Sequence, residues 1–164
     1  MKRQAGFTII EMLIVAAILA MLAGILVPVL EDAAASARDA RRAADLKAVQ
    51  ASLEAYRRVN GTFPIQSTLA GDYTAGKTYN TGAATDYIPG LVPTYMQSLP
   101  KDPDSRYPDA TNGWGYAYIS DATGDNYKFI ALGTPDNFPT GNPFADPARA
   151  ATSWAVYTPG AVAF

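Results

Sequence analysis

The chain has 164 residues with no Cys and no His, and its 13 Lys and Arg against 15 Asp and Glu give a formal net charge of −2. Without Cys it forms no disulfide, and without His it lacks the most common general base and zinc ligand, so a conventional catalytic triad is excluded. The charge balance does not favour a nucleic-acid-binding surface. The length fits one small domain beside an anchor segment.

The N-terminal stretch joins a short basic head to a long apolar run. Lys2 and Arg3 precede an apolar segment from Phe7 to Leu30, in which Glu11 is the single charge. As a helix this segment is about 36 Å long, which exceeds the roughly 30 Å hydrocarbon core of a bilayer. The positive-inside rule then keeps the head in the cytoplasm and sends the chain after Leu30 outward.

Glu11 is the unusual residue of this predicted membrane span. A carboxylate near the centre of a span costs on the order of 3 kcal/mol and less towards the edge, and such charges are usually paired and functional. Two interpretations follow. Glu11 either reaches water at the cytoplasmic interface or pairs with a positive charge supplied by another copy of the chain.

Residues 6–15, Gly-Phe-Thr-Ile-Ile-Glu-Met-Leu-Ile-Val, resemble the processing site and N-terminal segment of type IV pilins and type II secretion pseudopilins. The resemblance implies that a prepilin peptidase cuts between Gly6 and Phe7, removes the leader (residues 1–6) and N-methylates Phe7. It also implies that Glu11 pairs with the Phe7 amine of a neighbouring subunit during assembly. An ordinary secretory signal would instead end a shorter apolar region at a small-residue cleavage site. An uncleaved anchor is the alternative.

Gly24 and Pro28 interrupt the helical character of the span. Pro28 has no N–H for the Gly24 carbonyl, and Gly24 adds a helix penalty of about 1 kcal/mol. The pair predicts either a simple kink or, as the resemblance implies, a weak point that unwinds when the helix leaves lipid for a filament core.

Residues 31–58 continue the helix in an amphipathic form. Leu46, Val49, Leu53 and Tyr56 recur at steps of three and four, which predicts a stripe that packs on a sheet. Charged residues at helical spacing predict exposed pairs worth tenths of a kcal/mol: Asp39 with Arg42, Asp45 with Arg41 or Arg42, and Glu54 with Arg57 and Arg58. Asn60-Gly61 predicts a left-handed cap, so we expect one helix from Phe7 to about Arg58.

Residues 59–137 predict a globular domain. Residues 115–120 and 127–133 read as two strands joined by a turn at 121–126, which is a hairpin pattern. The stretch from Thr68 to Gly82 reads as a surface loop. A Phe-Pro after the helix, Leu-Pro-Lys-Asp-Pro at 99–103, and Ala-Leu-Gly-Thr-Pro-Asp at 131–136 are similar to Cys-free major pseudopilins.

The tail, residues 138–164, carries four prolines and scattered aromatic residues. We expect an extended segment that wraps the domain or touches neighbouring subunits, with Trp154 to Tyr157 as a possible short strand. Asp136 lies where some major pseudopilins bind calcium, but Asx turns explain the acidic loops more simply. No metal or cofactor is predicted.

The sequence therefore predicts an α+β fold in which a long N-terminal helix, first a membrane span and then a spine, packs on a small antiparallel β-sheet domain. We predict a structural subunit and no enzyme. It polymerises with identical copies into a type IV pilus-like extracellular filament. The resemblance implies as partners a prepilin peptidase, an inner-membrane assembly platform with a cytoplasmic ATPase, and the inner membrane before assembly.

Two alternatives remain open. One is a pseudopilin of a type II secretion pseudopilus, which residues 99–103 favour, whereas the aromatic tail favours a surface fibre and tips the choice narrowly towards the pilus. The other is a monomeric, membrane-anchored module that binds sugar or DNA.

Overall fold

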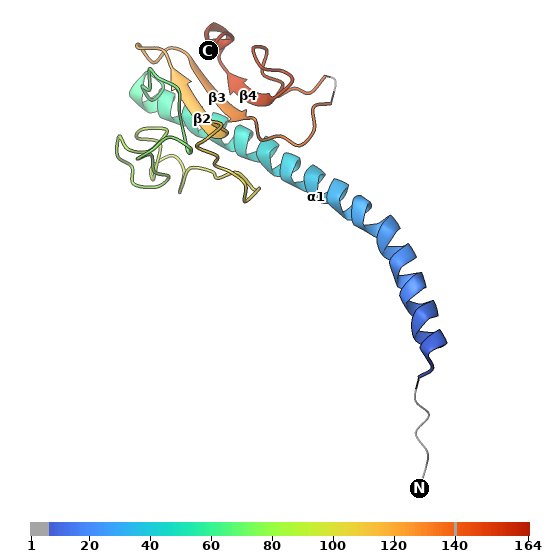
Figure 1. The fold of residues 1–164 in the computed structure, drawn as a ribbon. Helices are drawn as coiled ribbons and strands as arrows, with labels where there is room; N and C mark the ends of the chain where they lie inside the picture. The colour runs from blue at the N-terminus through green and yellow to red at the C-terminus, as the bar shows by residue number, and fades with distance from the viewer. Residues whose placement is uncertain (1–6, 140) are drawn as a thin grey trace. The chain divides into compact units, whose positions relative to one another are not determined.

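A computed structural model describes residues 7–139 and 141–164, and its dominant element is one helix, α1 (Ile9–Asn60) (Figure 1). Pro28 lies inside α1 without ending it. The helix stops where Gly61 takes a φ of 84° and its N–H bonds to the carbonyl oxygen of Arg57 at 2.8 Å. Glycine adopts this left-handed conformation at little cost, so the expected cap and the expected single helix are confirmed.

The chain divides into two units, one up to Ser36 and the other from Ala37 to Phe164. In the first unit, the large apolar side chains from Phe7 to Leu30 are 49% to 83% exposed. The helix is long and apolar enough to cross a membrane, and its most apolar stretch is not buried by the described residues. A surface of this kind needs lipid or other apolar helices to cover it.

The second unit contains a four-stranded antiparallel sheet in the order β1-β2-β3-β4. Its strands are β1 (Ala70–Gly71), β2 (Gly115–Ser120), β3 (Tyr127–Leu132) and β4 (Ser153–Tyr157). The predicted hairpin is confirmed as β2 and β3, with Gly115 opposite Leu132 and Ser120 opposite Tyr127. The short β1 was not predicted, because Ala70 and Gly71 lie in a stretch that reads as a loop.

The core of the second unit lies between α1 and the sheet (Figure 1). The predicted stripe supplies Leu46, Val49 and Leu53, all 0% exposed. Aromatic residues of β2 and β3 face this stripe, and their hydroxyls find partners: the Tyr116 hydroxyl donates to Asp45 at 2.9 Å and the Tyr118 hydroxyl to the Pro64 carbonyl at 2.8 Å. Buried Tyr hydroxyls usually find a hydrogen-bond partner, and those of Tyr116 and Tyr118 do so here.

The described part of the tail belongs to the second unit and completes its sheet. It supplies β4, including the suggested strand at Trp154 to Tyr157, and the short 3₁₀ helix η1 (Pro159–Ala161). Lys128 of β3 is fully buried, and its Nζ donates to Asp146 Oδ1 at 3.0 Å and to the Val162 carbonyl at 2.7 Å. The tail therefore covers a buried ammonium and contributes a strand to the domain.

Candidate assembly site

The N-terminal end of α1 is closed by a capping box between Thr8 and Glu11. The Thr8 backbone N–H and hydroxyl both donate to Glu11 Oε2, at 2.8 and 2.6 Å. In return, the Glu11 N–H donates to Thr8 Oγ1 at 3.3 Å. Thr8 precedes the first helical residue and Glu11 follows three positions later, which is the spacing of this motif. The pattern Thr-x-x-Glu was visible in the sequence, but its capping role was not predicted.

The capping box changes the account of Glu11. Within the described residues its carboxylate is bonded through one oxygen, Oε2, to the chain's own Thr8. The residue is exposed, so the carboxylate remains open to a donor from outside the chain. Chemically, the site is an anchored anion at the start of an apolar helix.

The remaining predicted site residues are spread along the first unit. Gly6, the proposed cleavage residue, lies outside the described residues. Phe7 is 81% exposed beside the capping box. Gly24 and Pro28 lie one helical turn apart further along α1, and a Cβ at Gly24 would meet no heavy atom within 4 Å. The structure thus brings Phe7, Thr8 and Glu11 together and places Gly24 and Pro28 apart from them.

A buried ion cluster fastens α1 to two loops of the second unit. Arg42 is 0% exposed, and its guanidinium donates to Asp102 at 2.7 and 2.8 Å, to Asp39 at 2.9 Å and to Asp136 at 2.7 Å. The Asp39 carboxylate accepts the backbone N–H groups of residues 136 and 137. A fully paired, bidentate arginine is the arrangement in which a buried charge is tolerated.

This cluster corrects the predicted charge pairs. Asp39 and Arg42 do pair, but in the interior and with partners from distant loops, so they are not the weak surface pair expected. Asp45 accepts the Tyr116 hydroxyl, and no ion pair is recorded for Asp45 or Glu54 among the described residues. The spacing was readable from the sequence, whereas the burial was not.

Two acids at the rim of the cluster are held ionised by arginines. The hydrogen bond from Arg38 is the main cause that lowers the pKa of Asp136. The hydrogen bond from Arg106 lowers the pKa of Asp104 to about 2. Hydrogen bonds to the charged form of a carboxyl have this effect.

The same arginines bear on the calcium alternative near Asp136. Its two carboxylate oxygens accept from Arg38 and Arg42 at 2.7 to 2.9 Å. Across residues 7–139 and 141–164, no group of three or more Asp and Glu is arranged to hold a metal ion. In this structure, guanidinium groups occupy the coordination positions that a cation would need.

Asp72 is the contrasting acid of the second unit. It is 8% exposed, and neither carboxylate oxygen has a hydrogen-bond partner among the residues that the structure describes. Burial raises its pKa to about 7. A Cβ on Gly115 would collide with Asp72 Oδ1, so glycine is needed there to leave room for the carboxylate.

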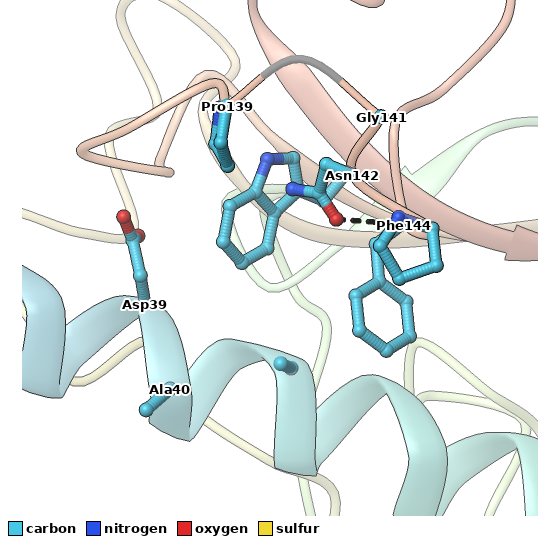
Figure 2. A pocket seen from close by; sticks show the side chains of 9 residues that line it. Asp39, Ala40, Pro139, Gly141, Asn142 and Phe144 are labelled. Carbon is cyan, nitrogen blue, oxygen red and sulfur yellow. Dashed lines mark hydrogen bonds between the residues drawn. The ribbon is translucent and has the colours of Figure 1, made fainter.

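A shallow apolar hollow of about 370 Å³ lies between α1 and the tail. Figure 2 shows Asp39 and Ala40 on the helix and Pro139 and Phe144 across from them. Within the tail, the Phe144 N–H donates to Asn142 Oδ1 at 2.9 Å. The one ionisable side chain that lines the hollow is Asp39, which is already committed to Arg42. The hollow therefore offers packing surface and no free acid or base.

The fold and the site define a class: a subunit with one apolar N-terminal helix, capped by Thr8 and Glu11, that carries a small antiparallel outer domain. Residues 1–27 match the family described as the prokaryotic N-terminal methylation motif. No solved structure gives a significant match.

Curated relatives extend the likeness beyond the N-terminus. The "Type II secretion system core protein G" of Klebsiella pneumoniae is 28% identical over 87% of this chain and 92% of its own length. The protein of the same name from Pseudomonas aeruginosa is 28% identical over 80% and 84%, and that of Aeromonas hydrophila 31% over 62% and 68%. The chain belongs to the type IV pilin and type II secretion pseudopilin family, and it is a pilin-like filament subunit.

Proposed function

We propose that this chain is a pseudopilin of a type II secretion system. The observation that carries the proposal is the likeness to core protein G over most of both chains, outer domain included. A shared N-terminal motif alone would suit pilins and pseudopilins equally. The secretion pseudopilus therefore replaces the surface pilus, which the sequence favoured narrowly, as the leading function.

The proposed cycle begins in the inner membrane, where the segment from Phe7 to Leu30 spans the bilayer. A prepilin peptidase removes residues 1–6 and methylates Phe7, and the subunit then joins a periplasmic filament. Burial of the exposed apolar side chains against one another provides cohesion. Because lipid is equally apolar, extraction gains little from this burial, so we expect an assembly platform with a cytoplasmic ATPase to supply the work.

In this proposal Glu11 exchanges partners. It leaves Thr8 and binds the Phe7 amine of an adjacent subunit in a desolvated core, where the ion pair sets the axial register of the filament. The open geometry of the carboxylate and its position one turn from Phe7 support this role. The protein acts as a structural element, and we propose no catalytic activity for it.

A gene-deletion experiment tests the proposal. The deletion strain is expected to retain proteins that depend on type II secretion inside the envelope, to keep its surface pili, and to recover secretion with the wild-type chain. Loss of surface pili with normal secretion would overturn the pseudopilin assignment and restore the pilus. Mass analysis of the mature subunit should give N-methyl-Phe7 as its first residue.

A further inference from the structure

A basic pocket lies on the second unit between α1 and two loops. It has a volume of about 450 Å³ and is lined by Arg41, Tyr79, Asn80, Ser98, Leu99, Pro100 and Lys101. Lys101 Nζ lies 4.1 Å from the centroid of the Tyr79 ring. The lining thus combines two cations and polar side chains with no carboxylate.

Both cations of the basic pocket are unpaired in the described part of the chain. Arg38, Arg42 and Arg106 form ion pairs, but Arg41 and Lys101 form none within 4.0 Å. The acid within helical reach of Arg41 is Asp45, which accepts the Tyr116 hydroxyl. Two unpaired cations in one recess create a positive potential that attracts an anion.

The chain presents the complementary charge at Glu31 and Asp32. These adjacent acids are both exposed and, within residues 7–139 and 141–164, neither forms an ion pair. Ion pairs along a helix join residues three or four apart, and no Lys or Arg stands within four positions of either acid. Arg41 is nine positions beyond Asp32, so the pair is unmatched within its own helix.

We propose that Glu31 and Asp32 of one copy bind in the basic pocket of another copy. This inference rests on the proposed filament. Glu31 and Asp32 follow directly on the apolar segment, so when that segment enters a filament core the two acids are brought among neighbouring subunits. Desolvated carboxylates need cationic partners there. Because the two surfaces differ, the contact is heterologous and repeats from copy to copy, as a helical polymer requires.

The choice of partner follows from stoichiometry and charge. Each copy carries both the basic pocket and the pair Glu31 and Asp32, so in a homopolymer the two surfaces are present in equal number and every pocket can find an occupant. Charge complementarity of this kind fixes the register between subunits and excludes wrong pairings.

A charge exchange tests the contact in the full-length chain. Arg41→Glu with Lys101→Glu, and separately Glu31→Lys with Asp32→Lys, are each expected to reduce filament yield roughly tenfold through like-charge repulsion. The four substitutions together are expected to restore most of the yield. Filaments are quantified by electron microscopy and by sedimentation of sheared material, and the melting temperature of each detergent-solubilised variant verifies folding.

A matched control separates this contact from a general effect of charge. Lys47 and Arg58 are exposed on α1 outside the basic pocket, and Lys47→Glu with Arg58→Glu changes the net charge by the same amount. Adding Glu31→Lys and Asp32→Lys to this control should give no recovery. Equal recovery in the control would overturn the inference.

Cysteine cross-linking gives an independent measurement, because the natural chain has no Cys. Asp32→Cys with Lys101→Cys should yield a ladder of covalent oligomers in oxidised filaments, since a disulfide requires Cα atoms within about 7 Å. Filaments of the double-Cys variant without a ladder, together with no recovery in the charge exchange, would overturn this contact, while normal wild-type filaments would leave the proposed function intact. Reduced binding of the pocket variant to anionic vesicles, with normal filaments, would assign the pocket to lipid headgroups and also overturn it. Absence of wild-type filaments would instead reject the filament itself.

Discussion

The two stretches of α1 differ in where their partners are found. Up to Ser36 the large apolar side chains are exposed, and Glu11 is bonded to its neighbour Thr8. From Ala37 onward, the same helix buries Arg42 among three aspartates and packs Leu46 on the sheet. The first stretch therefore depends on other molecules for its cover, whereas the second is satisfied within its own chain.

The largest expected effect is on filament yield, and it follows from a substitution in the first stretch. Glu11→Ala should permit processing yet reduce filament yield more than about a hundredfold, because in the proposed filament it would leave the Phe7 amine of the adjacent subunit without its partner in a desolvated core. Sedimentation of sheared filaments measures the yield, and the mass of the mature subunit verifies processing. Normal filament yield in this variant would contradict the assigned role.

The next largest effect is on the stability of the outer domain, and it follows from a substitution in the second stretch. Arg42→Ala should lower the free energy of unfolding of the outer domain by about 3–5 kcal/mol, since it leaves Asp39 and Asp102 buried without their cation, while Asp136 keeps Arg38. Denaturant unfolding of the detergent-solubilised chain, followed by near-ultraviolet circular dichroism, measures it. Arg41→Ala, an exposed neighbour, should change stability by less than about 0.5 kcal/mol. Similar losses in both variants would refute the difference between buried and exposed arginines.

A smaller effect is expected at Asp72, a buried acid that has neither a cation nor a hydrogen-bond partner for its carboxylate among the described residues. Burial raises the pKa of Asp72 from its ordinary 3.8 to about 7, so the folded state binds a proton that the unfolded state releases. Its contribution is therefore most favourable below about pH 4 and is lost as the pH rises to about 7, by up to about 1.4 kcal/mol per pH unit. Asp104 and Asp136 act oppositely, because their lowered pKa values place the loss of stability on the acid side, below about pH 4.

Unfolding of the detergent-solubilised chain between pH 4 and 8 measures this effect. Asp72→Asn should flatten the decline between about pH 4 and 7 and should stabilise the domain above pH 7. Asp45, whose pKa burial also raises, is expected to leave a small residual slope. An unchanged slope in the Asn variant would show that the buried carboxylate is paired in solution.

The smallest expected effect concerns calcium. Because Arg38 and Arg42 already occupy the Asp136 carboxylate, addition of calcium or of a chelator should leave the melting temperature of the outer domain unchanged. A clear rise with calcium would mean that the guanidinium groups are displaced, and would reopen the metal alternative.

Much of this architecture follows from local patterns. The helix, its glycine cap and the stripe Leu46, Val49 and Leu53 could be predicted because periodicity and capping residues are encoded within a few positions. The hairpin at β2 and β3 followed from alternating aromatic residues around a polar turn. The motif at Phe7 to Glu11 carried the family likeness for the same reason.

Features that depend on long-range contacts could not be predicted. The sequence pairs Asp39 with Arg42, but nothing local shows that Asp102 and Asp136 converge on the same guanidinium from positions 60 and 94 residues away. Tyr87, Ile88 and Leu91 lie in a stretch with little helical or strand periodicity, yet they are 0% exposed in the core. Their burial depends on tertiary packing, which overrides local propensity.

The hydrogen bonds between Thr8 and Glu11 give the Glu11 carboxylate a partner within its own chain before any other subunit is present. No hydrogen bond to the other oxygen, Oε1, is formed within residues 7–139 and 141–164, so the carboxylate can accept a second donor before it releases Thr8. In the filament that we propose, the exchange of partners at Glu11 would then pass through an intermediate in which one carboxylate holds both Thr8 and the incoming amine.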